Sequence, residues 1–423
     1  MWALSRAVGQ PTPMPLPAPP TPDQTLRPAD NAPHAVTARL ALTMVPDAAP
    51  LEGPAVLLAG RRILAVGPKR AVLRGFTGPV DDLGEAVLVP GLVNAHTHLE
   101  LSHLAGASPV GLGFCAWVRW LMAEPQAGLS AEALGQALAG AVAQAADTGT
   151  AAVIDVGNRA GPAVAQALRA AGLGGLVCQE YLGWRGQPPT ALPPALAAAA
   201  GDGVAASASG HALYSTSPDR LRRAMAVCRD RAAPFCLHLA EHPGEVELLA
   251  TGAGEFADLL RGRLLPKNWR APGRTPVAEA KAQGLLGPGT LAVHAVHLTP
   301  DDVAILAASG TTVCLCPRSN ARIGVGTADA PGLLAAGIPL ALGTDSLASN
   351  DDLNLWNEVR ALLAAHPGLP AQAILAALTT VPARLLGRET TLGRLAPGAV
   401  GGLAVIPPDL VDRLSLAQKK GSG

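Results

Sequence analysis

Five of the ten histidines and one aspartate come at the ends of apolar segments along this chain of 423 residues. These six residues are His96, His98, His211, His238, His294 and Asp345. His96 and His98 are two positions apart, and side chains at positions i and i+2 of a strand lie on the same face. Two imidazoles on one face can hold a single metal ion, so this pair predicts a metal site at a strand end.

The later residues of this set complete a plausible group of ligands. Three histidines and one carboxylate offer neutral nitrogen and anionic oxygen, which suits Zn²⁺, with Fe²⁺ as the alternative. Such a site can keep a position for water, whose pKa the metal lowers toward neutrality. Glu241, three residues after His238, is placed to carry protons, although an exposed loop carboxylate is the alternative interpretation. The residues therefore predict metal-assisted hydrolysis.

Between residues 90 and about 388, short apolar runs alternate with long helical stretches rich in alanine and leucine. Eight strands are predicted, at 92–96, 151–155, 175–181, 204–211, 235–239, 290–294, 311–316 and 339–345. Ser130, Ser217 and Thr299 are suitable N-caps for three of the helices between them. The eight strands span about 250 residues, which is the usual size of a (β/α)8 barrel. In such a barrel the C-terminal ends of all strands lie at one face, where the active site forms.

The two ends of the chain have a different pattern. Short strands with Gly and Pro turns are predicted at 37–43, 55–58, 62–66 and 86–88, with another at 402–406. We therefore expect an α/β protein, a (β/α)8 TIM barrel with a small β-sandwich formed by N- and C-terminal segments. The predicted units are a proline-rich extended arm at 1–34, the sandwich at 35–89 plus 389–412, and the barrel at 90–388.

Composition excludes several kinds of partner. Lys plus Arg and Asp plus Glu balance at 32 each, so no broad basic field is present, and we expect neither nucleic acid nor a membrane surface as partner. No apolar run approaches the ~20 residues of a membrane helix, and the N-terminus lacks the pattern of a secretory signal. Six scattered cysteines indicate reduced thiols. We expect a cytoplasmic protein that binds a small molecule, with a homo-oligomer left open.

Several motifs together resemble the amidohydrolase superfamily. They are 90–98 (PGLVNAHTH), 238–241 (HLAE), 294–298 (HAVHL) and 342–350 (LGTDSLASN), supported by 210–218 (GHALYSTSP) and 316–320 (CPRSN). The chain is similar in particular to a branch of mononuclear-metal deaminases and chlorohydrolases that act on aromatic heterocycles. That branch includes S-adenosylhomocysteine, aminodeoxyfutalosine and guanine deaminases. The resemblance covers residues 36 to 407.

The resemblance implies roles for individual residues. It implies one metal ion held by His96, His98, His238 and Asp345. Glu241 would carry a proton to a ring nitrogen of the substrate. His294 would orient the water at the metal, Asp345 would accept its proton, and His211 would contact the substrate. His297 competes with His294 for its role, but the family pattern favours the first histidine of that pair.

The lysines narrow the prediction further. Binuclear members of the superfamily usually bridge two metals through a carboxylated lysine on the fourth strand, whereas here none of the five lysines lies on that strand. We therefore expect one metal and hydrolytic deamination of an aromatic heterocycle, of the aminodeoxyfutalosine or S-adenosylhomocysteine type. A chlorohydrolase or cyclic amide hydrolase on the same scaffold is the alternative, and a catalytically silent binding protein is a more distant one.

Substrate contacts are suggested by two further residues. Glu100 is two positions after His98 and can bind an amine or hydroxyl of the substrate, with a carboxylate that orients a histidine as the alternative. The stretch around Glu100 looks more like the aminodeoxyfutalosine type than the adenosylhomocysteine type. Trp117 is a candidate for covering the pocket, and ordinary helix packing is the alternative.

Overall fold

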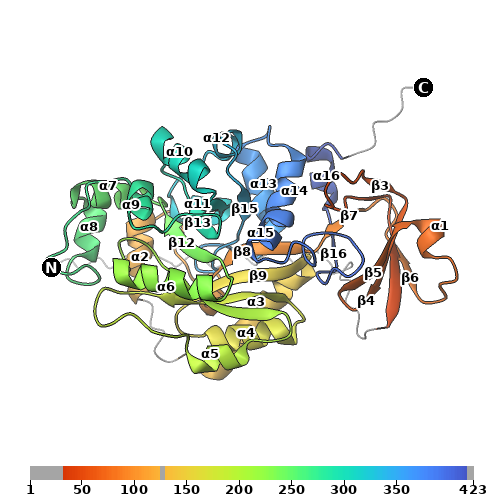
Figure 1. The fold of residues 1–423 in the computed structure, drawn as a ribbon, viewed down its shortest axis with the longest axis horizontal. Helices are drawn as coiled ribbons and strands as arrows, with labels where there is room; N and C mark the ends of the chain where they lie inside the picture. The colour runs from red at the N-terminus through yellow and green to blue at the C-terminus, as the bar shows by residue number, and fades with distance from the viewer. Residues whose placement is uncertain (1–31, 124–128, 417–423) are drawn as a thin grey trace, which may run out of the picture.

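The computed structural model describes residues 32–123 and 129–416 of the chain. Residues 1–31, most of the predicted proline-rich arm, lie outside the described part. Among the described residues, no helix is both long and apolar enough to span a membrane. Figure 1 shows an α/β body joined to a smaller β-rich part, which contains the first strands of the chain.

Eight parallel strands form two sheets of four. The first has the order β11-β10-β9-β8 and the second the order β12-β13-β14-β15. Their bounds are β8 Leu92–Thr97, β9 Thr150–Gly157, β10 Gly174–Tyr181, β11 Val204–Gly210, β12 Phe235–Leu239, β13 Thr290–His294, β14 Thr312–Leu315 and β15 Leu340–Leu342. Each corresponds to one of the eight strands predicted from the sequence.

Two contacts link the edges of these sheets. The backbone N–H of His238 in β12 donates to the carbonyl of His211, just after β11, at 2.9 Å. At the other edge, Thr97 of β8 forms a parallel bridge with Asp345, which follows β15. Both links involve residues of the predicted site or their neighbours, so the ends of the sheets meet where the chemistry is expected.

Helices flank the strands, with α3 to α6 on one side and α10 to α14 on the other in Figure 1. Their bounds are η1 Leu99–Leu104 (a 3₁₀ helix), α2 Phe114–Ala123, α3 Ala131–Asp147, α4 Gly161–Ala170, α5 Pro194–Ala199, α6 Pro218–Asp230, α7 Pro243–Thr251, α8 Glu255–Leu260, α9 Pro276–Ala282, α10 Pro300–Ser309, α11 Pro317–Ile323, α12 Ala330–Ala335, α13 Leu355–Ala365, α14 Ala371–Leu378, α15 Thr380–Leu385 and α16 Pro408–Arg413. The three predicted caps are confirmed, because the side chains of Ser130, Ser217 and Thr299 each accept a backbone N–H of the first turn.

The remaining strands form two small sheets, with orders β5-β4-β1-β6 and β16-β7-β2-β3. Their bounds are β1 Pro33–Thr37, β2 Leu40–Ala41, β3 Leu51–Glu52, β4 Pro54–Ala59, β5 Arg62–Pro68, β6 Val80–Asp82, β7 Val87–Pro90 and β16 Leu403–Val405, with the short helix α1 Lys69–Val72. The C-terminal strand lies in one sheet with N-terminal strands, since β16 runs antiparallel to β7. The single strand predicted at 37–43 is wrong, because the chain leaves one sheet after Thr37 and enters the other at Leu40.

Alternate residues of the parallel strands face two separate cores. On β10, Val177 and Tyr181 pack in the large cluster that includes many helix residues. Leu176 and Cys178 belong to a second cluster made largely of strand residues from both sheets, together with Cys236 of β12. Since side chains two apart share a face, Glu180 and His238 continue these inner rows at the strand ends.

Candidate active site

His96, His98 and His238 form the cluster that the sequence predicts. Their ligand nitrogens lie within 4.8 Å of one another, and Nε2 of His98 is 3.2 Å from Nε2 of His238. His96 is fully buried, and neither of its ring nitrogens has a hydrogen-bond partner among the described residues. Buried polar atoms without partners are rare, so unpaired nitrogens facing two more imidazoles fit a bound metal ion.

Asp345 brings a carboxylate to this cluster. Its Oδ1 lies 3.8 Å from Nε2 of His96 and 3.7 Å from Nε2 of His98. Its Oδ2 accepts hydrogen bonds from the hydroxyls of Ser319, at 2.6 Å, and Ser349, at 3.0 Å. Burial alone would raise the pKa of Asp345, but the three nearby histidines and the Ser319 hydroxyl outweigh it and lower the pKa to about 2. The residue is therefore an anionic oxygen donor held in place by two serines.

The backbone before Asp345 packs closely against the strand that carries His96. A Cβ added at Gly343 would lie 2.8 Å from the backbone nitrogen of His96, so only glycine lets the two segments come this close. Asp345 has a φ of 59° and His294 a φ of 75°, both in the left-handed region that residues other than glycine seldom adopt. Such conformations cost about 1–3 kcal/mol each and cluster at functional sites.

Glu241 and His294 lie together beside the cluster. Oε1 of Glu241 is 3.3 Å from Nε2 of His294, and Nδ1 of His294 is 2.9 Å from the side-chain oxygen of Asn320. With Asn320 oriented this way, Nδ1–H donates to that oxygen and leaves Nε2 of the neutral ring unprotonated and facing Glu241. His297 makes a different contact, because its Nε2 donates to the carbonyl of Val325 at 2.7 Å.

Burial sets the charge of these groups. It lowers the pKa of His96 and His238 well below the ordinary value, lowers that of His294, and lowers that of His211 to about 3. These rings are therefore neutral at pH 7, as metal ligands must be. Burial, with the nearby Asp345, raises the pKa of Glu241 to about 8, so in the metal-free protein this carboxyl holds a proton near neutral pH.

The shifted pKa values predict how the stability of the metal-free protein depends on pH. Burial raises the pKa of Glu180, Glu241, Glu245 and Glu358 to about 8. Their contribution to stability is complete below their unfolded pKa of about 4.5 and is lost as the pH rises through about 8. The depressed histidines act oppositely, and their contribution is complete above about pH 6.5.

Above pH 6.5 the contribution of the histidines no longer changes, so of these two groups only the four buried carboxyls change the free energy of unfolding. We expect the free energy of unfolding of chelator-treated protein to fall between pH 6.5 and 9. The slope is about 1.4 kcal/mol per pH unit for each carboxyl that stays protonated in the fold. Urea unfolding at several pH values measures it, and a free energy that is flat or rises over this range would contradict the assignment.

His211 directs the neighbouring ligand rather than joining the first cluster. Its carbonyl accepts hydrogen bonds from the backbone N–H and from Nδ1 of His238, the latter at 3.0 Å. Its own Nδ1 is 2.6 Å from the hydroxyl of Ser215. The contact through Nδ1 leaves Nε2 of His238 free to face His98. The predicted contact between His211 and substrate uses the remaining Nε2 and stays a prediction.

Several supporting residues were not predicted from the sequence. Asp155 on β9 accepts hydrogen bonds from the hydroxyl of Thr97 and the backbone N–H of Leu99, at 2.9 and 2.7 Å, and so fixes the chain around His98. Glu180, at the end of β10, has a carboxylate oxygen within 4.8 Å of ring nitrogens of His211 and His238. Its signal was present, because alternation along the predicted strand 175–181 places Glu180 on the same face as Cys178.

Glu100 lies in η1, and its carboxylate contacts the backbone of a neighbouring loop. Its Oε1 accepts the backbone N–H of Asn158, at 3.0 Å, and its Oε2 accepts those of Arg159 and Ala160, both at 2.9 Å. The carboxylate therefore anchors the loop between β9 and α4. Both oxygens are engaged in holding this loop. A contact between Glu100 and the substrate stays a prediction.

This anchoring predicts the effect of removing the carboxylate. We expect Glu100→Ala to lower the free energy of unfolding by about 2–3 kcal/mol, because hydrogen bonds to a charged group contribute more than neutral ones. Chemical denaturation measures this loss, and Glu100→Gln, which keeps an acceptor oxygen, should lose less. A rise in KM with unchanged stability would instead favour the predicted substrate contact.

Trp117 lies on α2 and is half-buried. Its ring N–H donates to the carbonyl of Ala348 at 2.9 Å, and its ring centroid is 6.0 Å from that of Phe114. The hydrogen bond ties α2 to the loop that follows Asp345. Trp117 therefore positions the edge of the site, and its contact with substrate stays a prediction.

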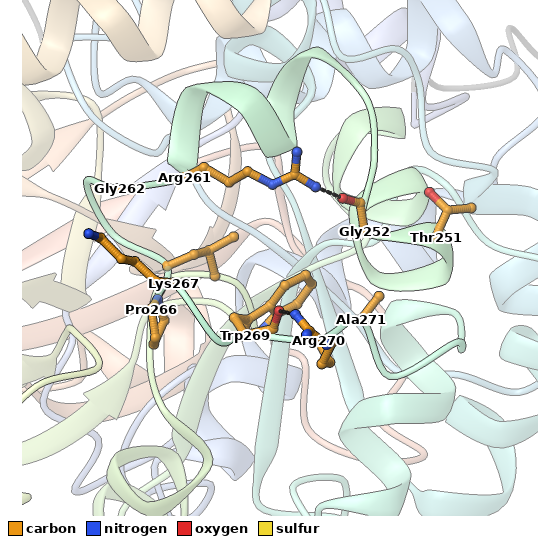
Figure 2. A pocket seen from close by; sticks show the side chains of 10 residues that line it. Thr251, Gly252, Arg261, Gly262, Pro266, Lys267, Trp269, Arg270 and Ala271 are labelled. Carbon is orange, nitrogen blue, oxygen red and sulfur yellow. Dashed lines mark hydrogen bonds between the residues drawn. The ribbon is translucent and has the colours of Figure 1, made fainter.

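A surface pocket of about 460 Å³ lies apart from these residues, at the end of α7 and along the segment that follows α8. Figure 2 shows the side chains of Lys267, Trp269 and Arg270 around it, with Arg261 donating to the carbonyl of Gly252. None of the predicted site residues lines this pocket. This basic pocket is therefore separate from the histidine cluster at the strand ends.

Comparison with known proteins agrees with this geometry. The model of the Amidohydrolase family matches residues 87–419. The 5-methylthioadenosine/S-adenosylhomocysteine deaminase of Nitratidesulfovibrio vulgaris is 30% identical over 84% of this chain and 80% of its own, and the aminodeoxyfutalosine deaminase of Deinococcus radiodurans is 30% identical over 79% and 82%. A zinc-bound adenosine deaminase from Xanthomonas campestris superposes with a TM-score of 0.73, at 25% identity over 91% of this chain and 87% of that one.

These matches cover most of the chain, and the range of the family model includes every residue of the histidine cluster. They imply a TIM-barrel fold of α/β type, in agreement with the two parallel sheets seen here. The relatives are deaminases by name, which is consistent with a carboxyl group, imidazoles and a possible metal site at one place. The chain belongs to the amidohydrolase family.

Proposed function

We propose that this protein is a metal-dependent hydrolase that removes an amino group from an aromatic heterocycle, with an adenine nucleoside derivative as substrate. The observation that carries the proposal is the contact of Glu241 with His294, 3.3 Å apart, beside three converging histidines and Asp345. The names of the two relatives that are 30% identical support the same reaction. In this reaction a C–O bond to water forms at the ring carbon, and the C–N bond to the amino group breaks to release ammonia.

The proposed metal ligands are His96, His98, His238 and Asp345, and they would hold one divalent ion, Zn²⁺ or alternatively Fe²⁺. Such an ion lowers the pKa of a water molecule and so supplies a nucleophile at neutral pH. The unpaired nitrogens of His96 and the anionic state of Asp345 support this assignment. The zinc in the Xanthomonas campestris structure supports the choice of metal.

Proton transfer falls to the residues beside the ligands. Glu241 would take a proton from the attacking water and deliver it to a ring nitrogen, which makes the ring carbon more electrophilic. His294 would orient the water through Nε2, because Asn320 occupies its Nδ1. Asp345 would accept the remaining proton and pass it to the amino group, which leaves as ammonia. The two serines on its Oδ2 would keep Oδ1 facing that position.

The larger architecture is part of the proposal. We infer that the two parallel sheets close into one (β/α)8 barrel at 90–388, since contacts at His238 and Thr97 link both pairs of edges. The two small sheets would form a sandwich from 35–89 and 389–412, and the arm at 1–34 would precede it. The six free and buried cysteines are in keeping with a reducing, cytoplasmic location.

A screen for ammonia release tests the proposed function. The zinc-loaded protein is incubated with adenosine, S-adenosylhomocysteine, aminodeoxyfutalosine, guanine and an aminotriazine, and a chelator-treated sample is the control. We expect ammonia from at least one adenine nucleoside derivative and none after chelation. Release of chloride from a chlorotriazine, or opening of a cyclic amide, without any ammonia would favour the alternative hydrolase.

A further inference from the structure

Glu180 is a buried acid at the proposed site that the reaction as described does not use. It lies at the end of β10, paired in register with Ser209 of β11, and only 6% of its surface is exposed. A carboxylate oxygen lies within 4.8 Å of ring nitrogens of both His211 and His238. The side chain therefore reaches the same place as the histidine cluster, from a different strand.

The hydrogen bonds of this carboxyl are incomplete. Its Oε2 has one contact, with the side-chain nitrogen of Asn158, at 3.4 Å. Its Oε1 is buried and has no partner among the described residues. Leaving a buried polar atom unpaired costs free energy, and such atoms persist mainly where a ligand or water completes them. The unpaired oxygen beside the cluster therefore points to a ligand.

A second metal ion is a weaker explanation than a substrate. Glu180, His211 and His238 could form a metal group of their own, but it shares His238 with the first cluster. Nδ1 of His238 is used by the carbonyl of His211, and its Nε2 lies 3.2 Å from Nε2 of His98. One free nitrogen serves one ion. If that ion lies among the three histidines, Glu180 lies beside it and its Oε1 still has no hydrogen-bond partner among the described residues.

We propose that Glu180 is a specificity-determining residue whose free carboxyl oxygen hydrogen-bonds a ring nitrogen of the heterocycle, a proposal that rests on the deaminase function above. Glu180 lies too close to the ligands to serve a distant substituent of the substrate. The unpaired oxygen, as the O–H of a neutral carboxyl, would donate to an unprotonated ring nitrogen. The purine ring offers such acceptors at N3 and N7.

The test compares wild type, Glu180→Gln and Glu180→Leu on adenosine, 3-deazaadenosine and 7-deazaadenosine. The leucine removes the hydrogen bond, and we expect kcat/KM on adenosine to fall about tenfold to a hundredfold. The glutamine keeps an N–H donor and should lose less than tenfold. The loss caused by leucine should shrink to within about threefold on the one analogue that lacks the contacted nitrogen. An equal loss on all three substrates would overturn the proposal.

Metal content and stability separate this role from a structural one. Glu358 is a matched control, because it is also buried but both its oxygens accept hydrogen bonds, from Asn350 and from the backbone of Arg318. We expect Glu358→Gln to lower the melting temperature and Glu180→Gln to leave it unchanged or raise it, with bound zinc unchanged. Loss of zinc or a large fall in melting temperature in Glu180→Gln would overturn the proposal. Absence of ammonia from wild type with every substrate would instead refute the deaminase function.

Discussion

Replacing Glu241 by glutamine is expected to lower kcat by about 10²–10⁴, the usual contribution of a positioned general acid or base. Glutamine has nearly the same shape but cannot take up and release a proton at this position. The carboxyl lies 3.3 Å from His294, so its loss affects the groups that act on water and ring together. Steady-state ammonia release on the best substrate of the screen measures the change, and bound zinc should stay near that of wild type.

A matched control for this variant is Glu245→Gln. Glu245 is four residues further on, is as buried as Glu241 and has its pKa raised to about 8 by the same cause. Its Oε2 accepts the backbone N–H of Glu241 at 3.0 Å, and the amide oxygen of glutamine can still do so. We expect this control to keep kcat within a few-fold of wild type. If Glu241→Gln also kept its turnover, Glu241 would not be the proton carrier.

The parallel strands and several helices were predictable because their signals are local. Alternation of side chains defines a strand, and a serine or threonine before an apolar run defines the start of a helix. Where the pattern of a strand continues while the chain passes from one sheet to another, it wrongly predicts a single strand. The sequence around Thr37 and Leu40 has the pattern of one strand, but the residues up to Thr37 pair with β4 and those from Leu40 pair with β7.

The histidine cluster was predictable for a related reason. Each ligand comes at the end of an apolar segment, and a parallel barrel brings such ends to one face whatever the length of the helices between them. No such rule applies to the residues that hold the site residues in place. Asn320 and Ser319 contact His294 and Asp345 across 26 positions, and nothing in a single sequence relates those positions.

Glu100 and Glu180 show where interpretation of the sequence reached its limit. Glu100 was assigned to the substrate because it shares a strand face with His98, but the chain turns into η1 at Leu99 and the carboxylate meets three backbone N–H groups of 158–160. Glu180 was overlooked at the end of an apolar strand, although its neighbour Cys178 faces the inner core. In both cases the sequence does not give the direction of the side chain, because that direction depends on tertiary contacts.

Removal of a metal ligand gives the second large effect. We expect His238→Ala to bind less than a tenth of an equivalent of zinc after desalting and to lose measurable ammonia release. His238 supplies one of three nitrogens that lie within 4.8 Å of one another, and its Nδ1 is already used by the carbonyl of His211. Loss of one ligand from a site of this kind lowers metal affinity steeply, and the remaining imidazoles cannot move closer because they end rigid strands.

The control for this variant is His297→Ala, which removes a histidine of the same sequence region without touching the cluster. His297 donates to Val325 and should keep both zinc and turnover. Thermal melts with and without chelator add an independent measure, because a ligand that binds only the folded state raises its stability. Chelation should lower the melting temperature of wild type and of His297→Ala but leave His238→Ala unchanged. Retention of a full equivalent of zinc by His238→Ala would mean that the ion lies elsewhere, and would remove the basis for the proposed roles of Glu241 and Glu180.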